Sequence, residues 1–220
     1  MRQGIAVFGG TFDPVHMGHL RSAMEVAEYL ELASIRLIPA SRPAHRDSPL
    51  CPLEQRLEML RLAVAEEPML QIDERECHRP GPSYMVDTLV SLRQEFGPEM
   101  PVTLALGVDS FHTLADWYRW EEIIGLAHIL VLSRPGWDDM PEGMLPGLVQ
   151  LLKQSEVQSK VTLQETPCGS LLWTSLTQLN ISASQIRQFV ADGRSVRYLA
   201  PDAVVDFILK NGLYRSVTNE

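Results

Sequence analysis

The residues best suited to chemistry lie in one short segment, residues 5–19, which reads IAVFGGTFDPVHMGH. Gly9 and Gly10 follow an apolar run, and His16 and His19 lie three positions apart. Backbone N–H groups in a glycine turn at a helix N-terminus bind anions, and the helix dipole adds positive potential there. Histidines three apart on a helix project to the same side. The segment therefore predicts a phosphate site faced by both histidines.

A second segment, residues 181–187, reads ISASQIR and has the pattern of a helix start. Ser182 and Gln185 have the spacing of a capping box, and Gly193 is placed to end the helix. A capped helix N-terminus with spare N–H groups also binds phosphate. Arg187 suits phosphate oxygens because its planar guanidinium donates two parallel hydrogen bonds, which a lysine cannot do.

These motifs need a scaffold, and the hydrophobic pattern along the chain predicts one. Helices are expected over residues 20–32, 52–66, 83–96, 182–191 and 201–209, with Ser83 as a possible N-cap of the third. Strands are expected over residues 5–8, 34–39, 70–72, 102–107, 128–132, 161–164 and 171–175. Strands separated by helices predict an α/β fold with a doubly wound, mostly parallel sheet.

Ligands of such sheets bind beyond the carboxyl ends of the strands, so the residues just after each strand are the site candidates. Four predicted strand ends carry glycine, basic groups or one carboxylate. These are Gly9, Gly10 and Thr11; residues 41–46, with His45 and Arg46; Gly107 and Asp109; and Arg134. Each alone resembles a solvated loop, and their agreement is what indicates a common site.

Composition bounds the class of protein. The 220 residues carry a formal net charge of −9, which argues against a general nucleic-acid binder and requires local clustering of Arg and His to hold an anion. The three cysteines have no CxxC spacing, so a reduced compartment is expected and a zinc site is not. No apolar stretch has membrane-spanning length, and the N-terminus lacks the pattern of a signal peptide, so a cytoplasmic location is expected.

The first motif resembles the signature of the nucleotidylyltransferase superfamily. Its Gly-Gly-x-Phe-x-Pro-x-His-x-Gly-His form is similar to the bacterial nicotinate-nucleotide adenylyltransferases. Residues 181–187 resemble the superfamily's Ile-Ser-x-Thr-x-Ile-Arg element, with Ser184 in place of threonine. Residues 39–46 resemble a Pro-x-x-x-Pro-Pro-His-Lys loop, from which Ala44 and Arg46 depart. Residues 82–89, 107–111, 117–120 and 213–214 extend the resemblance over essentially the whole chain.

The resemblance implies one Rossmann-like domain over residues 1–220, whose C-terminal helices, about 182–212, carry the second phosphate-binding motif. It implies transfer of the adenylyl group of ATP to nicotinate mononucleotide, which gives nicotinate adenine dinucleotide and pyrophosphate. Magnesium would enter with the ATP phosphates, and no dedicated protein cage is expected because Mg²⁺ keeps its waters when phosphates supply ligands. Oligomeric state is not determined by the sequence.

The resemblance also implies roles for individual residues. The catalytic group comprises His16, His19 and Arg187. The ATP-binding group comprises Gly9, Gly10, Thr11, Phe12, Gly107, Asp109, Arg134, Ile181, Ser182 and Ser184. The nicotinate-nucleotide group comprises His45, Arg46, Thr88, Trp117 and Tyr118, with Trp117 stacked on the pyridine ring. For Trp120 a packing role is expected.

Three alternatives remain open at this stage. The acceptor could be nicotinamide mononucleotide or pantetheine phosphate in place of nicotinate mononucleotide. A cytidylyltransferase shares the first motif, but its Arg-Thr-x-Gly-Ile-Ser-Thr form of the second motif is absent here. A non-catalytic nucleotide sensor on the same fold should have lost a phosphate-binding group, whereas His16, His19 and Arg187 are all present.

Overall fold

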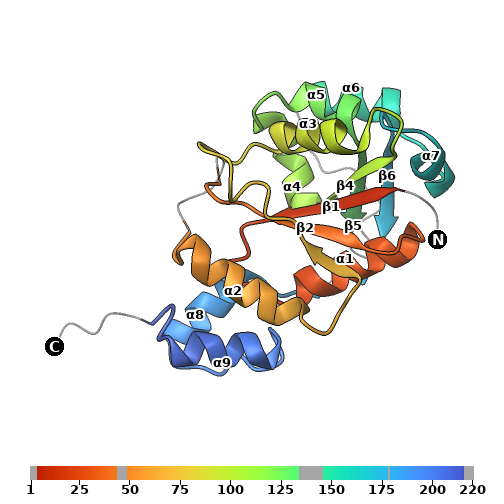
Figure 1. Cartoon of the computed structure of the whole chain (residues 1–220). Coiled ribbons are helices and arrows are strands. Elements are labelled where there is room, and N and C mark those ends of the chain that lie inside the picture. The colour runs from red at the N-terminus through yellow and green to blue at the C-terminus, as the bar shows by residue number, and fades with distance from the viewer. Residues whose placement is uncertain (1–3, 44–48, 134–145, 178, 216–220) are drawn as a thin grey trace.

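A central parallel sheet lies between two layers of helices in the computed structural model, which describes residues 4–43, 49–133, 146–177 and 179–215 (Figure 1). Its six strands have the spatial order β3-β2-β1-β4-β5-β6, and every neighbouring pair is parallel. The strands are β1 (Ile5–Gly10), β2 (Ile35–Pro39), β3 (Leu70–Ile72), β4 (Val102–Gly107), β5 (His128–Ser133) and β6 (Leu171–Ser175). The expected doubly wound sheet is confirmed.

The order of the strands reverses between β1 and β4. The chain steps outward from β1 to β2 and β3, then returns to pair β4 with the other side of β1. In open α/β sheets a ligand binds in the crevice beyond the carboxyl ends of the strands at such a switch point. The ends of β1 and β4, at Gly10 and Gly107, therefore mark where the site should lie.

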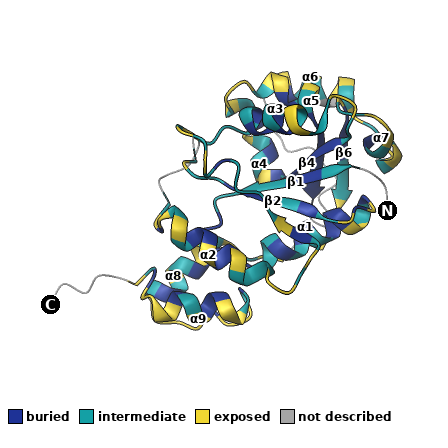
Figure 2. Cartoon of the chain, in the orientation of Figure 1, coloured by how far each residue is buried: buried dark blue, intermediate teal, exposed yellow. Residues whose placement is uncertain are grey.

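Two apolar clusters, one on each face of the sheet, hold the layers together. One face packs against α1 (Met17–Tyr29), α2 (Leu53–Val64), α8 (Ala183–Ala191) and α9 (Asp202–Lys210). The other packs against α3 (Met85–Phe96), α4 (Val108–His112), α5 (Trp120–Leu126) and α6 (Pro146–Ser155). The short η1 (Leu114–Asp116) follows α4. Figure 2 shows buried and intermediate residues along the strands and exposed residues on the outer faces of the helices, as amphipathic helices require.

Two expectations are wrong. Residues 161–164 form not a strand but part of helix α7 (Lys160–Glu165), because Ser159 caps it through its side chain and Leu163 is buried on one side of a single turn. Ser83 does not cap α3, whose N-cap is Tyr84. Its hydroxyl instead accepts hydrogen bonds from the main-chain N–H groups of Ser41 and Arg42, at 2.9 and 3.2 Å.

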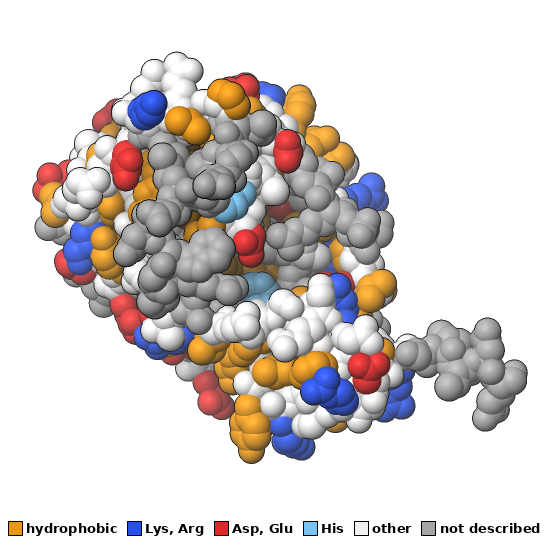
Figure 3. All heavy atoms as spheres, turned by 180° about the vertical axis from the view of Figure 1, so that it is seen from behind, with side chains coloured by type: hydrophobic (Ala, Val, Ile, Leu, Met, Phe, Trp, Pro, Cys, Tyr) orange, Lys and Arg blue, Asp and Glu red, His pale blue; other side chains and the backbone are white. Residues whose placement is uncertain are grey.

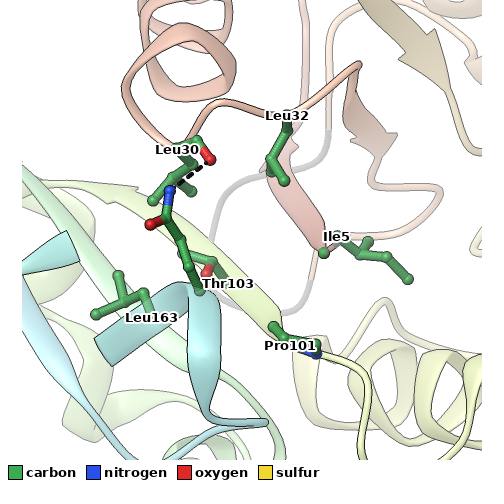
Figure 4. Close-up of a pocket in the computed structure, with 8 residues that line it drawn as sticks. Ile5, Leu30, Leu32, Pro101, Thr103 and Leu163 are labelled. Atoms are coloured by element: carbon green, nitrogen blue, oxygen red, sulfur yellow. Dashed lines mark hydrogen bonds between the residues drawn. The ribbon is translucent and has the colours of Figure 1, made fainter. Parts of the chain in front are cut away.

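A small cavity lies at the amino ends of the strands, away from the switch-point strand ends (Figure 4). Its lining is mainly apolar and includes Ile5, Leu32 and Pro101. The side chain of Gln164 donates to the Leu30 carbonyl oxygen at 2.9 Å there. This arrangement closes the sheet at the amino ends of its strands, and none of the described residues that line the cavity has a charged side chain that could bind a phosphate. Among the helices that the structure describes, none is both long and apolar enough to cross a bilayer.

Candidate active site

The two histidines of the first motif lie together where β1 passes into α1. His16 is the N-cap of α1, and His19 lies in its first turn. Their rings stack with centroids 3.6 Å apart and planes 22° apart. The Nδ1 atom of His16 accepts from the His19 main-chain N–H at 3.4 Å, so the ring proton of neutral His16 is on Nε2. The expectation that both rings share one side of the chain is confirmed.

Burial controls the charge of this pair. His16 is 5% exposed, and desolvation lowers its pKa from 6.5 to about 4. His16 is therefore neutral near pH 7 and presents an Nε2–H donor. A neutral His16 also avoids charge repulsion with the ring stacked on it.

The glycine loop places these rings through close contacts. Phe12 has φ of 50° and a buried side chain whose ring meets His19 edge-on, with centroids 5.1 Å apart. A Cβ atom on Gly10 would lie 2.9 Å from the Phe12 ring, and one on Gly9 would lie 2.7 Å from the Met85 side chain. A side chain at Gly10 would thus clash with the buried Phe12 ring, whereas at Gly9 the end of the flexible Met85 side chain would have to move aside. Phe12 was expected to bind ATP, and in the structure its side chain also supports His19.

Gly18 lies where the two motifs meet. A Cβ atom there would lie 3.1 Å from two ring atoms of His16 and 3.5 Å from the carbonyl oxygen of Ile181. The segment that begins α8 therefore passes directly over the first turn of α1, although Gly18 and Ile181 are 163 positions apart in the sequence. The absence of a side chain at Gly18 permits this approach.

Arg187 joins the second motif to the first. Its Nη1 donates to the Asp13 carbonyl oxygen at 2.7 Å, and its Nη2 donates to the Ser184 hydroxyl at 3.1 Å. Ser182 caps α8 by accepting from the Gln185 main-chain N–H at 3.1 Å, as expected. Gly193, with φ of 68°, ends the helix as expected. The guanidinium is thereby held beside the histidine loop.

Asp13 anchors the loop that Arg187 contacts. Its carboxylate is 4% exposed, and it accepts from the Tyr214 hydroxyl at 2.7 Å and from the Leu50 main-chain N–H at 2.8 Å. Burial raises the pKa of Tyr214, so its hydroxyl remains a donor at neutral pH. The sequence motifs predict no role for Asp13, and Tyr214 is part of the family resemblance alone. Its place inside the first motif was the available signal for Asp13.

The end of β4 is open, and an aromatic cluster lies further along the chain. Nothing lies within 4 Å of a Cβ atom built on Gly107, and Asp109 is exposed in the first turn of α4. Trp117 is half-buried at the end of η1. The next residue, Tyr118, is 49% exposed, and its ring packs on that of Tyr84 with centroids 4.4 Å apart. An aromatic wall therefore joins the loop after η1 to the start of α3.

Thr88 lies behind this wall and is fully buried. Its hydroxyl donates to the Glu76 carboxylate at 2.5 Å and accepts from Arg79 Nη2 at 3.1 Å. Its main-chain N–H donates to the Tyr84 carbonyl oxygen at 3.3 Å. Desolvation raises the pKa of Glu76. Thr88 was expected to receive a carboxylate, and in the structure its donors are already used within the wall.

Three predicted site residues lie outside the described residues: His45, Arg46 and Arg134. Trp120 has its expected packing role, because a Cβ atom on Gly147 would lie 3.2 Å from its ring. Figure 3 shows histidine side chains reaching the surface in the middle of the rear face, with charged side chains of both signs scattered around them. In the described ranges, no three His, Cys, Asp or Glu residues are grouped as a metal site would require.

The parallel sheet with two paired motifs at the ends of its strands is the architecture of a nucleotidyltransferase. Residues 7–189 match the family model described as cytidylyltransferase-like, and the chain belongs to this family. A "Probable nicotinate-nucleotide adenylyltransferase" of Pseudomonas putida (strain W619) is 47% identical over 212 residues, which are 96% of this chain and 95% of that protein. A relative of the same name from Hahella chejuensis (strain KCTC 2396) is 45% identical over 214 residues, 97% and 96% of the two chains. Within the family, the chain groups with the nicotinate-nucleotide adenylyltransferases.

A solved structure supports the same fold. The Plasmodium falciparum nicotinic acid mononucleotide adenylyltransferase complexed with NaAD superposes with a TM-score of 0.73, over 96% of this chain and 97% of that one. The two sequences are 16% identical, so this likeness bears on the arrangement of the elements.

Proposed function

We propose that this protein transfers the adenylyl group of ATP to nicotinate mononucleotide in NAD biosynthesis, giving nicotinate adenine dinucleotide and pyrophosphate. The observation that carries the proposal is the meeting of the two motifs. The stacked His16–His19 pair lies just beyond the end of β1. The Arg187 guanidinium is held beside it by a hydrogen bond to the Asp13 carbonyl oxygen, and the absence of a side chain at Gly18 lets the start of α8 come close. Its relatives at 45–47% identity bear the name of this activity.

Adenylyl transfer requires that the two substrates be positioned for attack and that negative charge on the phosphates be stabilised. A phosphate oxygen of the acceptor attacks the α-phosphorus of ATP, the bond from that phosphorus to the bridging oxygen breaks, and pyrophosphate leaves. His16 Nε2–H and His19 stabilise negative charge on the α-phosphate, and Arg187 holds the departing phosphates. No protein nucleophile is needed.

The remaining residues divide between the two substrates. ATP is surrounded by residues at the ends of β1 and β4 and at the start of α8, with Arg134 as a further phosphate contact. These residues are Gly9, Gly10, Thr11 and Phe12; Gly107 and Asp109; and Ile181, Ser182 and Ser184. Trp117 and Tyr118 face the pyridine ring, and His45 and Arg46 bind the phosphate of the mononucleotide. Since the donors of Thr88 are used internally, the nicotinate carboxylate is received by main-chain N–H groups near Tyr118 and at the start of α3, which has no side-chain cap.

Magnesium fits this site as a companion of the ATP phosphates. Both carboxylate oxygens of Asp13 accept protein hydrogen bonds, whereas Asp109 is exposed. Asp109 would therefore hold the hydrated ion, which neutralises charge on the phosphates. The chain works as one nucleotidylyltransferase domain over residues 1–220, with the second phosphate motif in about 182–212, and acts in the cytoplasm.

The test compares acceptors. Purified protein is given ATP and Mg²⁺ with nicotinate mononucleotide, nicotinamide mononucleotide or pantetheine phosphate, and kcat/KM is measured for each. The acid should be preferred over the amide by about tenfold to a hundredfold, because the amide NH₂ leaves a buried donor unpaired at about 1–3 kcal/mol. Equal values for acid and amide contradict the substrate assignment. ATP binding without turnover of any acceptor favours a nucleotide sensor instead.

Trp117 separates ring recognition from acid recognition. Stacking does not distinguish the acid from the amide, so Trp117→Ala should weaken both mononucleotides and leave their ratio similar. Trp120→Phe keeps the packing against Gly147 and should change neither value. A large change of the ratio in Trp117→Ala would show that this residue also shapes the carboxylate site.

A further inference from the structure

Arg56 is a buried cation on the apolar face of α2. It is 1% exposed and lies among Leu57, Met59 and Leu60, all buried. Within the described part of the chain, its guanidinium donates to four main-chain carbonyl oxygens: Nε to Cys51 at 3.2 Å, Nη1 to Thr11 at 2.6 Å and to Ala40 at 2.8 Å, and Nη2 to Ser41 at 3.1 Å. Desolvation lowers the pKa of Arg56, and arginine nevertheless remains charged in proteins.

The carbonyl oxygens belong to two loops that bear on the reaction. Thr11 follows the glycines at the end of β1, on the ATP side of the proposed site. Ala40 and Ser41 follow the end of β2 and begin the segment 40–43. One Nη1 atom therefore bridges the ends of two adjacent strands. A main-chain hydrogen bond from Ala40 to the Gly10 carbonyl oxygen, at 2.9 Å, also joins them.

Segment 40–43 is also held from its other side. The Ser83 hydroxyl accepts from the main-chain N–H groups of Ser41 and Arg42, and the Ser83 N–H donates to the Arg42 carbonyl oxygen at 2.8 Å. Arg56 binds the carbonyl oxygens of Ala40 and Ser41, and Ser83 binds the N–H groups of Ser41 and Arg42 together with the carbonyl oxygen of Arg42. The segment is thereby fixed between α2 and the start of α3.

The cost of burying Arg56 argues for a role beyond packing. A buried charge costs several kcal/mol before compensation, and an apolar side chain could close the same face of a helix. A planar guanidinium does what an apolar residue cannot, because it fixes several acceptors at set distances and angles. The acceptors fixed here lie in the glycine loop, which the proposed function places beside ATP, and in the segment that leads along the sequence to His45 and Arg46, which it assigns to the mononucleotide phosphate.

We propose that Arg56 is a positioning residue for adenylyl transfer, which sets the spacing between the glycine loop at the end of β1 and segment 40–43. This inference rests on the proposed function. Ser83 holds segment 40–43, and Arg56 adds two hydrogen bonds from one Nη1 atom to the single main-chain bond between Ala40 and Gly10 that joins this segment to the glycine loop. Loss of its planar guanidinium therefore harms the alignment of the two substrates more than the binding of either one.

The chain contains a matched control in Arg93, on α3. Its guanidinium also collects main-chain carbonyl oxygens, with Nε to Leu126 at 2.8 Å and Nη2 to Pro167 at 2.6 Å. Its Nη1 donates to Met100 and Pro98. Desolvation lowers the pKa of Arg93 as well. These carbonyls precede β4, β5 and β6, at the end of the sheet away from the site.

The experiment compares Arg56→Lys with Arg93→Lys. Both keep the charge and lose the planar guanidinium, so both should lower the melting temperature. In Arg56→Lys, kcat at saturating ATP and nicotinate mononucleotide should fall about tenfold to a hundredfold, the range expected for misaligned reactants. The Kd of each substrate alone, measured by calorimetry with a non-hydrolysable ATP analogue and with the mononucleotide, should change less than about threefold. Arg93→Lys should keep kcat within about twofold.

Ser83→Ala tests the same segment from its other side and covers the case in which Arg56→Lys fails to fold. It should lower kcat with little change in either Kd. Unchanged kcat in Arg56→Lys, or equal losses of kcat in both lysine variants at equal loss of stability, would overturn the inference. If Arg56→Lys is insoluble, unchanged kcat in Ser83→Ala overturns it. The unmutated protein is assayed first, and its failure to turn over the mononucleotide counts against the proposed function rather than against Arg56.

Discussion

The histidine pair is the feature on which the chemistry depends at the scale of single residues. His19 lies in the first turn of α1, against the Phe12 ring and stacked on His16. His19→Ala should leave the fold intact and lower kcat about a hundredfold to a thousandfold, the usual loss for one charge-stabilising donor. Steady-state kinetics together with a thermal melt check this. A variant that melts normally and retains near-normal kcat would contradict the role of His19.

His16 should make the protein sensitive to acid. Its pKa is about 4 in the folded chain and returns towards 6.5 on unfolding, so the unfolded chain binds the proton more strongly between these values. The stability from neutral His16 is thus fully present above pH 6.5 and is lost as the pH falls towards 4. The loss amounts to up to about 3 kcal/mol at 1.36 kcal/mol per pKa unit.

The test is His16→Asn, because asparagine is also a good N-cap. Melting temperatures of both proteins are measured from pH 7 down to about pH 4. The variant should lose less stability across this interval, although buried His128, whose pKa is also lowered, leaves both proteins some pH dependence. Parallel curves would show that His16 is not the group that titrates.

At the scale of elements, the contact between α1 and the start of α8 depends on Gly18. In Gly18→Ala the new methyl group would lie 3.1 Å from the His16 ring and 3.5 Å from the Ile181 carbonyl oxygen. One of these groups must shift, so kcat should fall about tenfold and the melting temperature should drop. Gly125→Ala is the control, because nothing lies within 4 Å of the added methyl group. Equal kinetics in the two variants would mean that α1 and α8 tolerate separation.

The sequence predicted most of these elements and the central part of the site, and the exceptions have physical causes. The alternation Val161-Thr-Leu163-Gln fits a short strand and a single helical turn equally well, and the Ser159 cap selected the helix. Ser83 has the type and position of a cap, but it contacts segment 40–43, some 42 positions earlier. A charged residue on the apolar stripe of α2, Arg56, indicates a buried cation with hydrogen-bond partners. The identity of the carbonyl oxygens that it binds depends on the tertiary fold.

At the scale of the whole molecule, the first motif is completed by a distant part of the chain. The Tyr214 hydroxyl reaches Asp13 across 201 positions, and the Leu199 carbonyl oxygen accepts from the Met17 N–H at 2.9 Å, at the start of α1. Tyr214→Phe removes one donor from a buried carboxylate and should lower the free energy of unfolding by about 1–3 kcal/mol. The KM for ATP should rise, because Arg187 contacts the same Asp13.

Denaturant unfolding and ATP kinetics measure both effects. Tyr198→Phe is the control, since Tyr198 also has positive φ but is 85% exposed. It should alter neither quantity. The role given to Tyr214 fails if its variant behaves like the Tyr198 variant in both measurements.

The reach of Tyr214 has a consequence for synthesis on the ribosome. The glycines and histidines of the first motif emerge early. The Tyr214 hydroxyl that fixes their loop, and the Leu199 carbonyl oxygen that accepts from the Met17 N–H, emerge some 180 to 200 residues later. At a usual rate of about 5–20 residues per second, roughly 10–40 seconds separate the two events. A nascent chain thus displays the nucleotide-binding signature long before it can hold it in shape, so ATP can stabilise only the finished product. Nucleotide should slow the unfolding of the released protein and give no protection from protease to ribosome-bound chains that stop short of Tyr214.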